Sequence, residues 1–234
     1  MGRILAERPV FTLDPLFHAG AYYVQDSSAM FVGHVFRGLE LFEGIRVLDL
    51  CAAPGGKTTD ISASLRQVLG DRFLLVGNEV MRQRASVLCD NVARWGDPNV
   101  VVTGVDPAAF AGLGGFFDII VADVPCSGEG MFRKDPKAGE QWSQETVALC
   151  AARQKRILAD VWPALKKGGF LLYSTCTYNE QENDLNLRWA AANLGGDIVE
   201  PKPEFEEAGV RLTDCGHLLK AGESLGEGQW AGLV

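Results

Sequence analysis

Short apolar runs alternate with longer amphipathic stretches along most of this chain. Each apolar run stops at a turn rich in Gly, Asn, Asp or Ser, which is the pattern of a buried strand. Strands are predicted on this basis at residues 45–50, 72–77, 100–103, 117–122 and 170–174. Further strands are expected near the end of the chain, at 210–212 and 229–234.

The stretches between these runs have the pattern of amphipathic helices. Helices are predicted at residues 57–69, 81–95, 144–165 and 180–193. Gly70 and Gly96 supply stop signals after the first two, and Lys166-Lys167-Gly168 after the third. Strands that alternate with such helices predict an α/β fold, with a Rossmann-like, doubly wound and mostly parallel sheet covered on both faces. Ligands of such sheets bind at the carboxyl ends of the strands.

A chain of 234 residues fits one large α/β domain. The first 40 residues contain Tyr22, Tyr23 and several Phe, without a clear period. We expect residues 1–40 to pack as a lead-in against a catalytic domain that spans residues 41–234.

The composition is that of an ordinary globular protein, with 47% hydrophobic and 22% charged residues. The apolar runs are all shorter than the ~18 residues of a membrane helix, and the N-terminus lacks the order of a signal peptide. A cytoplasmic protein without a membrane segment is therefore expected. The cysteines form no CxxC pair and have no His at ligand spacing, so no metal site is expected. They lie at positions 51, 89, 126, 150, 176 and 215.

The turn after the first predicted strand has features of a nucleoside site. Its small residues and two glycines, Gly55 and Gly56, allow a ligand to approach the backbone closely. The turn is neither a dinucleotide fingerprint nor a phosphate loop, which suits a nucleoside without phosphates. Glu79, after the second strand, can accept hydrogen bonds from both ribose hydroxyls, and Asp106, after the third, is placed for an adenine amino group. Each carboxylate taken singly is also explained as a helix N-cap or a solvated charge.

Three long motifs carry a specific family resemblance. DLCAAPGGKT at 49–58, DVPCSGEG at 123–130 and STCTYNEQEN at 174–183 resemble RNA cytosine-5 methyltransferases of the Nol/Nop/Sun group. GEGMFRKDP at 128–136 most resembles the bacterial 16S ribosomal RNA enzymes. YYVQDSSAM at 22–30 resembles the N-terminal motif of the family, with its serines one place early, and GEGQWAGL at 226–233 its closing strand. The resemblance therefore covers nearly the whole chain.

The resemblance implies a class I S-adenosylmethionine-dependent methyltransferase fold, with the last strand antiparallel. It also implies S-adenosylmethionine as the cofactor. The cofactor contacts that it implies are Cys51, Ala52, Ala53, Pro54, Gly55, Gly56, Lys57, Glu79, Arg84, Asp106 and Asp123.

Two cysteines are candidates for covalent catalysis on cytosine. Carbon 5 of the ring is a poor nucleophile until a thiolate adds to carbon 6, and a free Cys has some thiolate near neutral pH. Cys126, in a Pro-Cys, and Cys176, in a Thr-Cys, both suit the task, and the chemistry alone does not choose between them. The RNA family that this sequence resembles attacks with the Thr-Cys, which implies Cys176 as nucleophile and Cys126 as its helper in product release. Asp123 is a candidate to hydrogen-bond N3 of the ring.

The remaining cysteines, Cys89, Cys150 and Cys215, are interpreted as structural core residues, and Cys51 as contributing backbone to the cofactor turn.

RNA as the partner requires positive charge, because phosphate contacts dominate affinity, yet the net charge is −8. Arg133 and Lys134 are candidate phosphate contacts, and Pro125 and Lys57 complete the predicted substrate contacts. Lys57 has the alternative role of holding Asp123 in position. The acidic balance predicts weak RNA binding by this chain alone. An additional RNA-binding domain or partner outside the chain is expected to help, which suggests a fragment or a minimal form.

The sequence thus predicts methyl transfer from S-adenosylmethionine to carbon 5 of a cytosine in RNA, with 16S ribosomal RNA favoured and transfer RNA as the alternative. A DNA cytosine methyltransferase is disfavoured by the Thr-Cys and by the lack of room for a target-recognition region. A catalytically weak or silent RNA-binding scaffold is disfavoured by the intact Asp123, Cys126 and Cys176. The sequence does not reveal which cytosine is modified.

Overall fold

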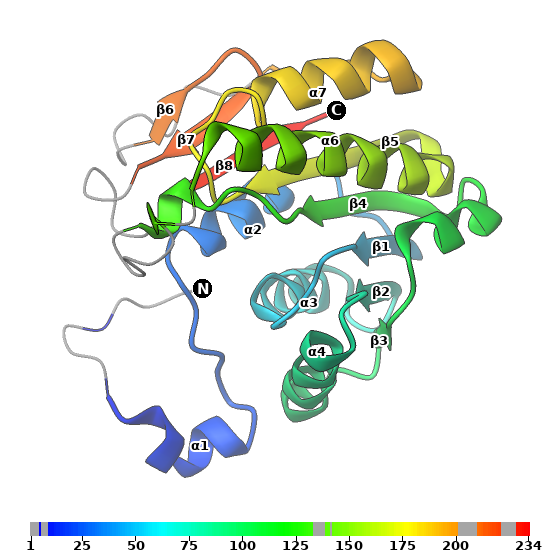
Figure 1. Ribbon diagram of the computed structural model, residues 1–234. Coiled ribbons are helices and arrows are strands. Elements are labelled where there is room, and N and C mark those ends of the chain that lie inside the picture. The colour runs from blue at the N-terminus through cyan, green and yellow to red at the C-terminus, as the bar shows by residue number, and fades with distance from the viewer. Residues whose placement is uncertain (1–4, 6–8, 133–138, 141, 201–209, 221–227) are drawn as a thin grey trace.

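One mixed sheet of eight strands lies at the centre of the computed structural model, which describes residues 5, 9–132, 139–140, 142–200, 210–220 and 228–234 (Figure 1). The strand order across the sheet is β3-β2-β1-β4-β5-β8-β7-β6. The strands are β1 (Ile45–Asp49), β2 (Phe73–Asn78), β3 (Val100–Thr103), β4 (Phe117–Asp123), β5 (Leu165–Thr175), β6 (Val210–Leu212), β7 (Gly216–Leu219) and β8 (Gln229–Leu233).

The strands β1 to β5 pair in parallel, and the order reverses between β1 and β4. β8 then pairs antiparallel with β5, and β7 and β6 continue the sheet antiparallel. This arrangement confirms the predicted doubly wound, mostly parallel sheet with an antiparallel last strand. A sheet of this kind binds its ligand where the strand order reverses, which here is the carboxyl edge of β1 and β4.

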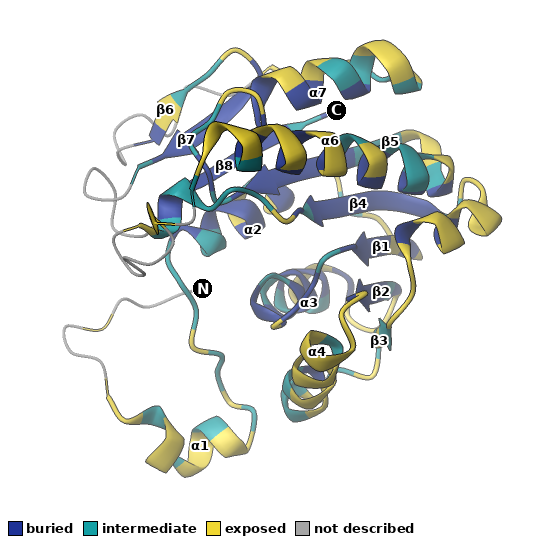
Figure 2. Ribbon diagram, in the orientation of Figure 1, coloured by how far each residue is buried: buried dark blue, intermediate teal, exposed yellow. Residues whose placement is uncertain are grey.

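Helices cover both faces of the sheet and bury its strands (Figures 1 and 2). One face is covered by α2 (Ala29–Arg37) and α3 (Gly56–Leu69), with α4 (Arg82–Trp95) packed beside them on the β2–β3 side. The opposite face is covered by the 3-10 helix η2 (Pro107–Leu113), α6 (Gln144–Val161) and α7 (Asp184–Ala190). The shorter helical turns are η1 (Phe11–Leu13), α1 (Pro15–His18), η3 (Glu129–Met131), η4 (Trp162–Ala164) and η5 (Ala191–Gly195).

The lead-in divides into two parts that the hydrophobic pattern did not separate. α2 buries Phe31, Val32 and Phe36 against α3 and the sheet, so it belongs to the core. The residues around η1 and α1 instead extend along the lower side of the molecule (Figure 1), where Leu13 and Leu16 are exposed. The predicted boundary at residue 41 therefore falls after a helix that already packs on the domain.

Four further elements differ from the prediction. The helix expected to reach residue 165 ends at Val161, because Pro163 has no N–H to donate to an earlier carbonyl, and the 3-10 turn η4 follows. β5 accordingly begins at Leu165, earlier than predicted. The helix expected from residue 180 begins at Asp184, after a turn over residues 179–183, and β7 was not predicted at all.

Candidate active site

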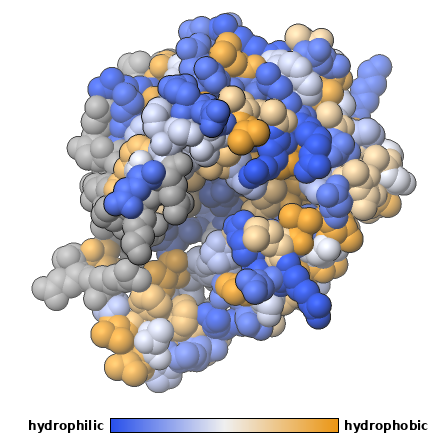
Figure 3. Space-filling view, in the orientation of Figure 1, coloured by the Kyte–Doolittle hydropathy of each residue, from blue (hydrophilic) through white to orange (hydrophobic). Residues whose placement is uncertain are grey.

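The carboxyl ends of β1 to β5 bring the predicted site residues to one edge of the sheet. Asp106 follows β3, Glu79 follows β2, and the cofactor turn follows β1. Asp123 ends β4, and Cys176 follows β5. Figure 3 shows a hollow between the N-terminal segment and the sheet, on the side to which these strand ends point. Arg133 and Lys134 lie outside the described residues.

The cofactor turn between β1 and α3 is held from several sides. Gly55 has φ of 111°, a backbone conformation that favours glycine. Asn91 Nδ2 donates to the Pro54 carbonyl at 2.7 Å, and Gln25 Nε2 donates to the Gly56 carbonyl at 2.7 Å. A Cβ on Gly56 would come within 2.5 Å of Gln25 Oε1, so a larger residue there would displace the Gln25 side chain. Gln25, within the N-terminal motif, thereby ties the lead-in to this turn.

Two buried carboxylates beside the turn each keep one oxygen without a hydrogen-bond donor. Asp49 is fully buried; its Oδ2 accepts from Thr58 Oγ1 at 2.6 Å, and its Oδ1 has no donor. Burial raises the pKa of Asp49 to about 6, against the lowering effect of the Thr58 hydrogen bond. Glu79 is 3% exposed; its Oε1 accepts from the Met81 N–H at 2.9 Å, and its Oε2 has no donor. Buried oxygens in this state are the ones that a ligand with N–H or O–H groups satisfies.

Arg84 and Asp106 have partners within the protein. Arg84 Nη2 donates to the Ala53 carbonyl at 2.8 Å, while its Nη1 lies 3.3 Å from Glu79 Oε2, so Arg84 links the cofactor turn to Glu79. Asp106 Oδ1 accepts from the Ala108 N–H at 3.0 Å and caps η2. The N-cap explanation of Asp106 therefore accounts for one of its two oxygens.

Asp123 is surrounded by donors from three different elements. Its Oδ2 accepts from Lys57 Nζ at 2.7 Å, and its Oδ1 accepts from Ser174 Oγ at 2.8 Å and Gln229 Nε2 at 3.3 Å. Burial lowers the pKa of Lys57, but the Asp123 charge and its hydrogen bond outweigh burial and raise it. Lys57 therefore stands as a cation beside Asp123, between the cofactor turn and the cysteines.

The two candidate cysteines are in direct contact, with Cys126 Sγ 3.1 Å from Cys176 Sγ. The hydrogen bond between them lowers the pKa of Cys176, against burial, and the Lys57 charge adds to the lowering. The same hydrogen bond and burial raise the pKa of Cys126. The surroundings thus lower the pKa of Cys176 and raise that of Cys126, a difference that the residue types alone did not provide.

The Gly128–Gly130 loop fixes the backbone that carries Cys176. The Gly130 N–H donates to the Cys176 carbonyl at 2.9 Å, and a Cβ on Gly130 would lie 2.8 Å from that oxygen. Glu129 Oε2 accepts from the Tyr178 N–H at 3.0 Å, and its Oε1 accepts from Trp142 Nε1 at 3.0 Å. The glycines therefore allow close approach of two loops, and Glu129 holds them together.

Sequence reasoning missed three residues that support the site, namely Glu129, Glu182 and Asn183. Glu182 and Asn183 are 0% and 1% exposed and hydrogen-bond to the two cysteine loops. All three lie inside the quoted motifs, which is the one signal that marked them. Cys89 was also misinterpreted, because it is exposed on α4 and not a core residue, whereas Cys150 and Cys215 are buried.

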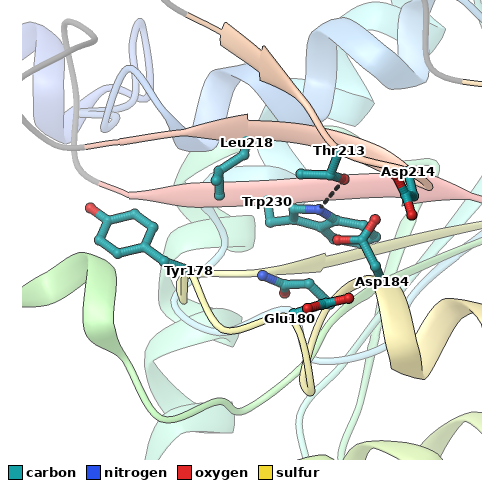
Figure 4. A pocket seen from close by; sticks show the side chains of 8 residues that line it. Tyr178, Glu180, Asp184, Thr213, Asp214, Leu218 and Trp230 are labelled. Atoms are coloured by element: carbon teal, nitrogen blue, oxygen red, sulfur yellow. Dashed lines mark hydrogen bonds between the residues drawn. The ribbon is translucent and has the colours of Figure 1, made fainter.

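A separate cavity of about 280 Å³ lies behind Tyr178, two residues after Cys176. Figure 4 shows Asp184, Asp214 and Glu180 at its wall, with Trp230 donating to Thr213 Oγ1 at 3.1 Å. The residues of the cofactor turn do not line it.

Within the described part of the chain, no helix is long and apolar enough to cross a membrane. The same residues contain no group of three or more His, Cys, Asp or Glu placed to hold a metal ion.

Comparison with known proteins identifies a family whose model matches most of this chain. A family model described as 16S rRNA methyltransferase RsmB/F matches residues 37–193. The ribosomal RNA small subunit methyltransferase F of Pectobacterium carotovorum subsp. carotovorum (strain PC1) is 42% identical over 199 residues, which is 84% of this chain and 39% of that protein. The protein of the same name from Vibrio cholerae serotype O1 (strain M66-2) is 38% identical over 86% of this chain and 42% of its own length. The chain thus spans about two fifths of the length of these curated relatives.

Solved structures share the fold. A methyltransferase homologue from Pyrococcus horikoshii has a TM-score of 0.73 and 26% identity, over 97% of this chain and 71% of that one. NSun6 from the same organism, solved with SFG, has a TM-score of 0.79 and 24% identity, over 97% of this chain and 56% of its own.

Proposed function

The chain belongs to the 16S rRNA methyltransferase RsmB/F family, and from that premise we propose that it transfers a methyl group from S-adenosylmethionine to carbon 5 of a cytosine in 16S ribosomal RNA. The family match supports ribosomal RNA as the substrate. The contact between Cys126 Sγ and Cys176 Sγ at 3.1 Å, at the mouth of a nucleoside-type site, is the observation that carries the cytosine-5 chemistry.

The residues beside β1 and β2 fit S-adenosylmethionine. Asp49 Oδ1 is buried without a donor, Glu79 Oε2 has the Arg84 guanidinium at 3.3 Å but no hydrogen bond, and the cofactor offers an ammonium group and two ribose hydroxyls as donors. We assign Glu79 to the ribose hydroxyls, Asp106 to the adenine amino group, and the backbone of residues 51–57, with Asp49 behind it, to the amino-acid end. When bound, the cofactor supplies the electrophilic methyl group.

Replacing Glu79 with alanine is expected to weaken S-adenosylmethionine binding about 10- to 100-fold. The reason is the loss of charge-assisted hydrogen bonds to the ribose, which contribute about 1.5–3 kcal/mol. Isothermal titration calorimetry measures the dissociation constant directly. Glu43→Ala is the matched control, since Glu43 is an exposed carboxylate paired with Arg72. Equal affinities of the Glu79 variant and the wild type would contradict the assignment.

The chain's own residues account for the covalent step. The Cys176 thiolate adds to carbon 6 of the cytosine, which turns the ring into an enamine with a nucleophilic carbon 5. The ring nitrogen N3 gains a proton during this addition. A protonated Asp123 donates its carboxyl hydrogen to N3, and the Lys57 cation, with Nζ 2.7 Å from Asp123 Oδ2, stabilises the carboxylate that this leaves.

Release of the product breaks the bond between Cys176 and carbon 6 of the base. After methylation the proton on carbon 5 leaves to a base, the proton on N3 returns to the Asp123 carboxylate, the double bond re-forms, and Cys176 departs as thiolate. The S–H group of Cys126 stabilises that leaving thiolate through the same contact that lowers the pKa of Cys176. The assignment of Cys176 as nucleophile and Cys126 as helper is supported by the opposite directions of their pKa shifts and by the family resemblance.

Bisulfite sequencing of total RNA from cells with and without this protein tests the function. The expected result is one or a few cytosines of 16S ribosomal RNA that resist conversion only when the protein is present. Cells that carry the Cys176→Ala variant are the control for indirect effects. A protein-dependent cytosine found in transfer RNA and not in 16S RNA would favour the alternative substrate, and no dependent cytosine would overturn the proposal.

A cytoplasmic site of action is part of the same proposal. It is supported by the six cysteines, which are all free thiols, as expected where thiols are kept reduced.

A further inference from the structure

Asn183 holds both sides of the Cys176 loop. Thr175 Oγ1 donates to Asn183 Oδ1 at 2.6 Å, and Asn183 Nδ2 donates to the Thr177 carbonyl at 3.0 Å. Thr175 and Thr177 flank Cys176, so one buried amide bridges the residue before the nucleophile and the residue after it. The backbone around Cys176 is therefore fixed from the inside of the protein.

Glu182 holds the Cys126 loop in the same way. Its Oε2 accepts from the Ser127 N–H at 3.0 Å and from Gln154 Nε2 at 2.8 Å, and Gln154 Nε2 also donates to the Pro125 carbonyl at 3.0 Å. Pro125 and Ser127 flank Cys126. Glu182 is 0% exposed and its Oε1 has no donor, so burial of this carboxylate is unfavourable unless its remaining contacts compensate.

The two loops are also joined to each other and to the core. Ser127 Oγ lies 3.0 Å from Thr177 Oγ1, next to the contact between the two sulfurs. Behind them, the Tyr173 hydroxyl is hydrogen-bonded to the Glu182 carbonyl and, at 3.1 Å, to Gln154 Oε1. Glu182 and Asn183, which are adjacent in one turn, thus fix the positions of both thiols relative to β5 and α6.

We propose that Glu182 and Asn183 are positioning residues that hold the two thiols in contact, and that the Glu182 carboxylate places a negative charge on the Cys126 side of the pair. This inference rests on the proposed function for its meaning in catalysis. It explains why two cysteines in contact take different roles, because the Lys57 cation lies on the Cys176 side of the pair and the Glu182 carboxylate on the Cys126 side.

The charges around the pair are distributed unequally. Cys176 faces Lys57, which lowers its pKa, and Asp123, which opposes this. Cys126 faces Glu182, whose charge adds to the hydrogen bond and the burial that raise its pKa. Glu182 itself faces Glu129 from η3, Cys150 from α6 and Tyr173 from β5. Burial raises the pKa of Glu182, while the Ser127 and Gln154 donors oppose that effect and favour the carboxylate.

The test measures the two thiols separately in the whole chain carrying Glu182→Gln. This variant keeps the hydrogen-bond acceptor and removes the charge. Limiting iodoacetamide is reacted at a series of pH values, and alkylation at each cysteine is quantified by peptide mass spectrometry. In the wild type, alkylation near neutral pH is expected to occur mainly at Cys176. In the variant, the pH midpoint for Cys126 is expected to fall by about one unit, because a nearby like charge has been removed, and its share of alkylation to rise several-fold.

Glu180→Gln is the matched control, since it removes a charge from an exposed residue of the same turn. Circular dichroism and S-adenosylmethionine affinity establish that each variant is folded. Unchanged midpoints in Glu182→Gln, or an equal shift in Glu180→Gln, would overturn the inference.

Asn183→Asp provides a second test should Glu182→Gln fail to fold. It places a negative charge beside the Cys176 loop, so the Cys176 midpoint is expected to rise by about one unit. An unchanged pH midpoint for Cys176 in this variant would count against the proposed role of Asn183. A wild-type protein that shows the expected thiol reactivity but methylates no RNA would overturn the proposed function alone, because alkylation needs neither RNA nor cofactor.

Discussion

Replacing Cys176 with alanine is expected to abolish RNA methylation while leaving S-adenosylmethionine binding intact. The alanine side chain cannot add to carbon 6, so carbon 5 stays a poor nucleophile, and the rate is expected to fall by about 10⁴-fold or more. Binding survives because the cofactor residues lie after β1, β2 and β3, whereas Cys176 follows β5. Transfer of labelled methyl groups to RNA measures the first effect, and calorimetry the second.

Cys89→Ala is the matched control for loss of a thiol. Cys89 is exposed on α4 and has no part in the proposed chemistry, so this variant should methylate at the wild-type rate. An active Cys176→Ala together with an inactive Cys126→Ala would reverse the assignment and make the Pro-Cys thiol the nucleophile. Full activity of both single variants would rule out covalent catalysis by either cysteine.

Much of the fold was predictable because the parallel strands are buried on both faces and therefore appear as plain apolar runs. β3 was predicted with its exact bounds, and β1, β2 and β4 to within a residue or so at each end. The errors came from competing local signals. Pro163 ends α6 inside a stretch that otherwise looks helical, and β7 begins with Gly216 and His217, which interrupt the apolar run that marked the other strands.

The site was predictable wherever a residue follows a strand directly, since parallel strands deliver their ends to one edge. Asp123, Cys126 and Cys176 come together for that reason. Glu182 and Asn183 could not be assigned in this way, because their partners are distant in sequence. The contact from Ser127 to Glu182 spans 55 residues, and that from Gln154 to Glu182 spans 28. Nothing local in the turn 179–183 shows that its carboxylate points inward.

The different pKa directions of the two cysteines could likewise not be predicted from the sequence. A Cys in a Thr-Cys and a Cys in a Pro-Cys have the same intrinsic acidity, and only their surroundings separate them. Lys57 reaches the pair from the first turn of α3, and Glu182 reaches it from the turn before α7. In the proposed mechanism, the difference between nucleophile and helper is therefore a property of the assembled fold.

Replacing Cys126 with alanine is expected to trap a covalent complex between the protein and RNA. Cys176 still attacks in this variant, but the departing Cys176 thiolate loses the S–H donor 3.1 Å away. Without that stabilisation, release is expected to slow by about 100-fold or more, the scale of a lost proton donor in catalysis. The adduct should appear as a slowly migrating band on a denaturing gel, labelled in both protein and RNA, with few turnovers per molecule.

Two further variants identify the bond and the role of the donor. The double variant Cys126→Ala/Cys176→Ala should form no adduct, since the atom that binds carbon 6 is gone. Cys126→Ser restores an O–H donor at the same position, so it should release product faster than Cys126→Ala does. Clean turnover by Cys126→Ala without an adduct would contradict the release role. An adduct that persists in the double variant would show that another residue attacks the base, because an alanine at 176 has no group that can form the bond.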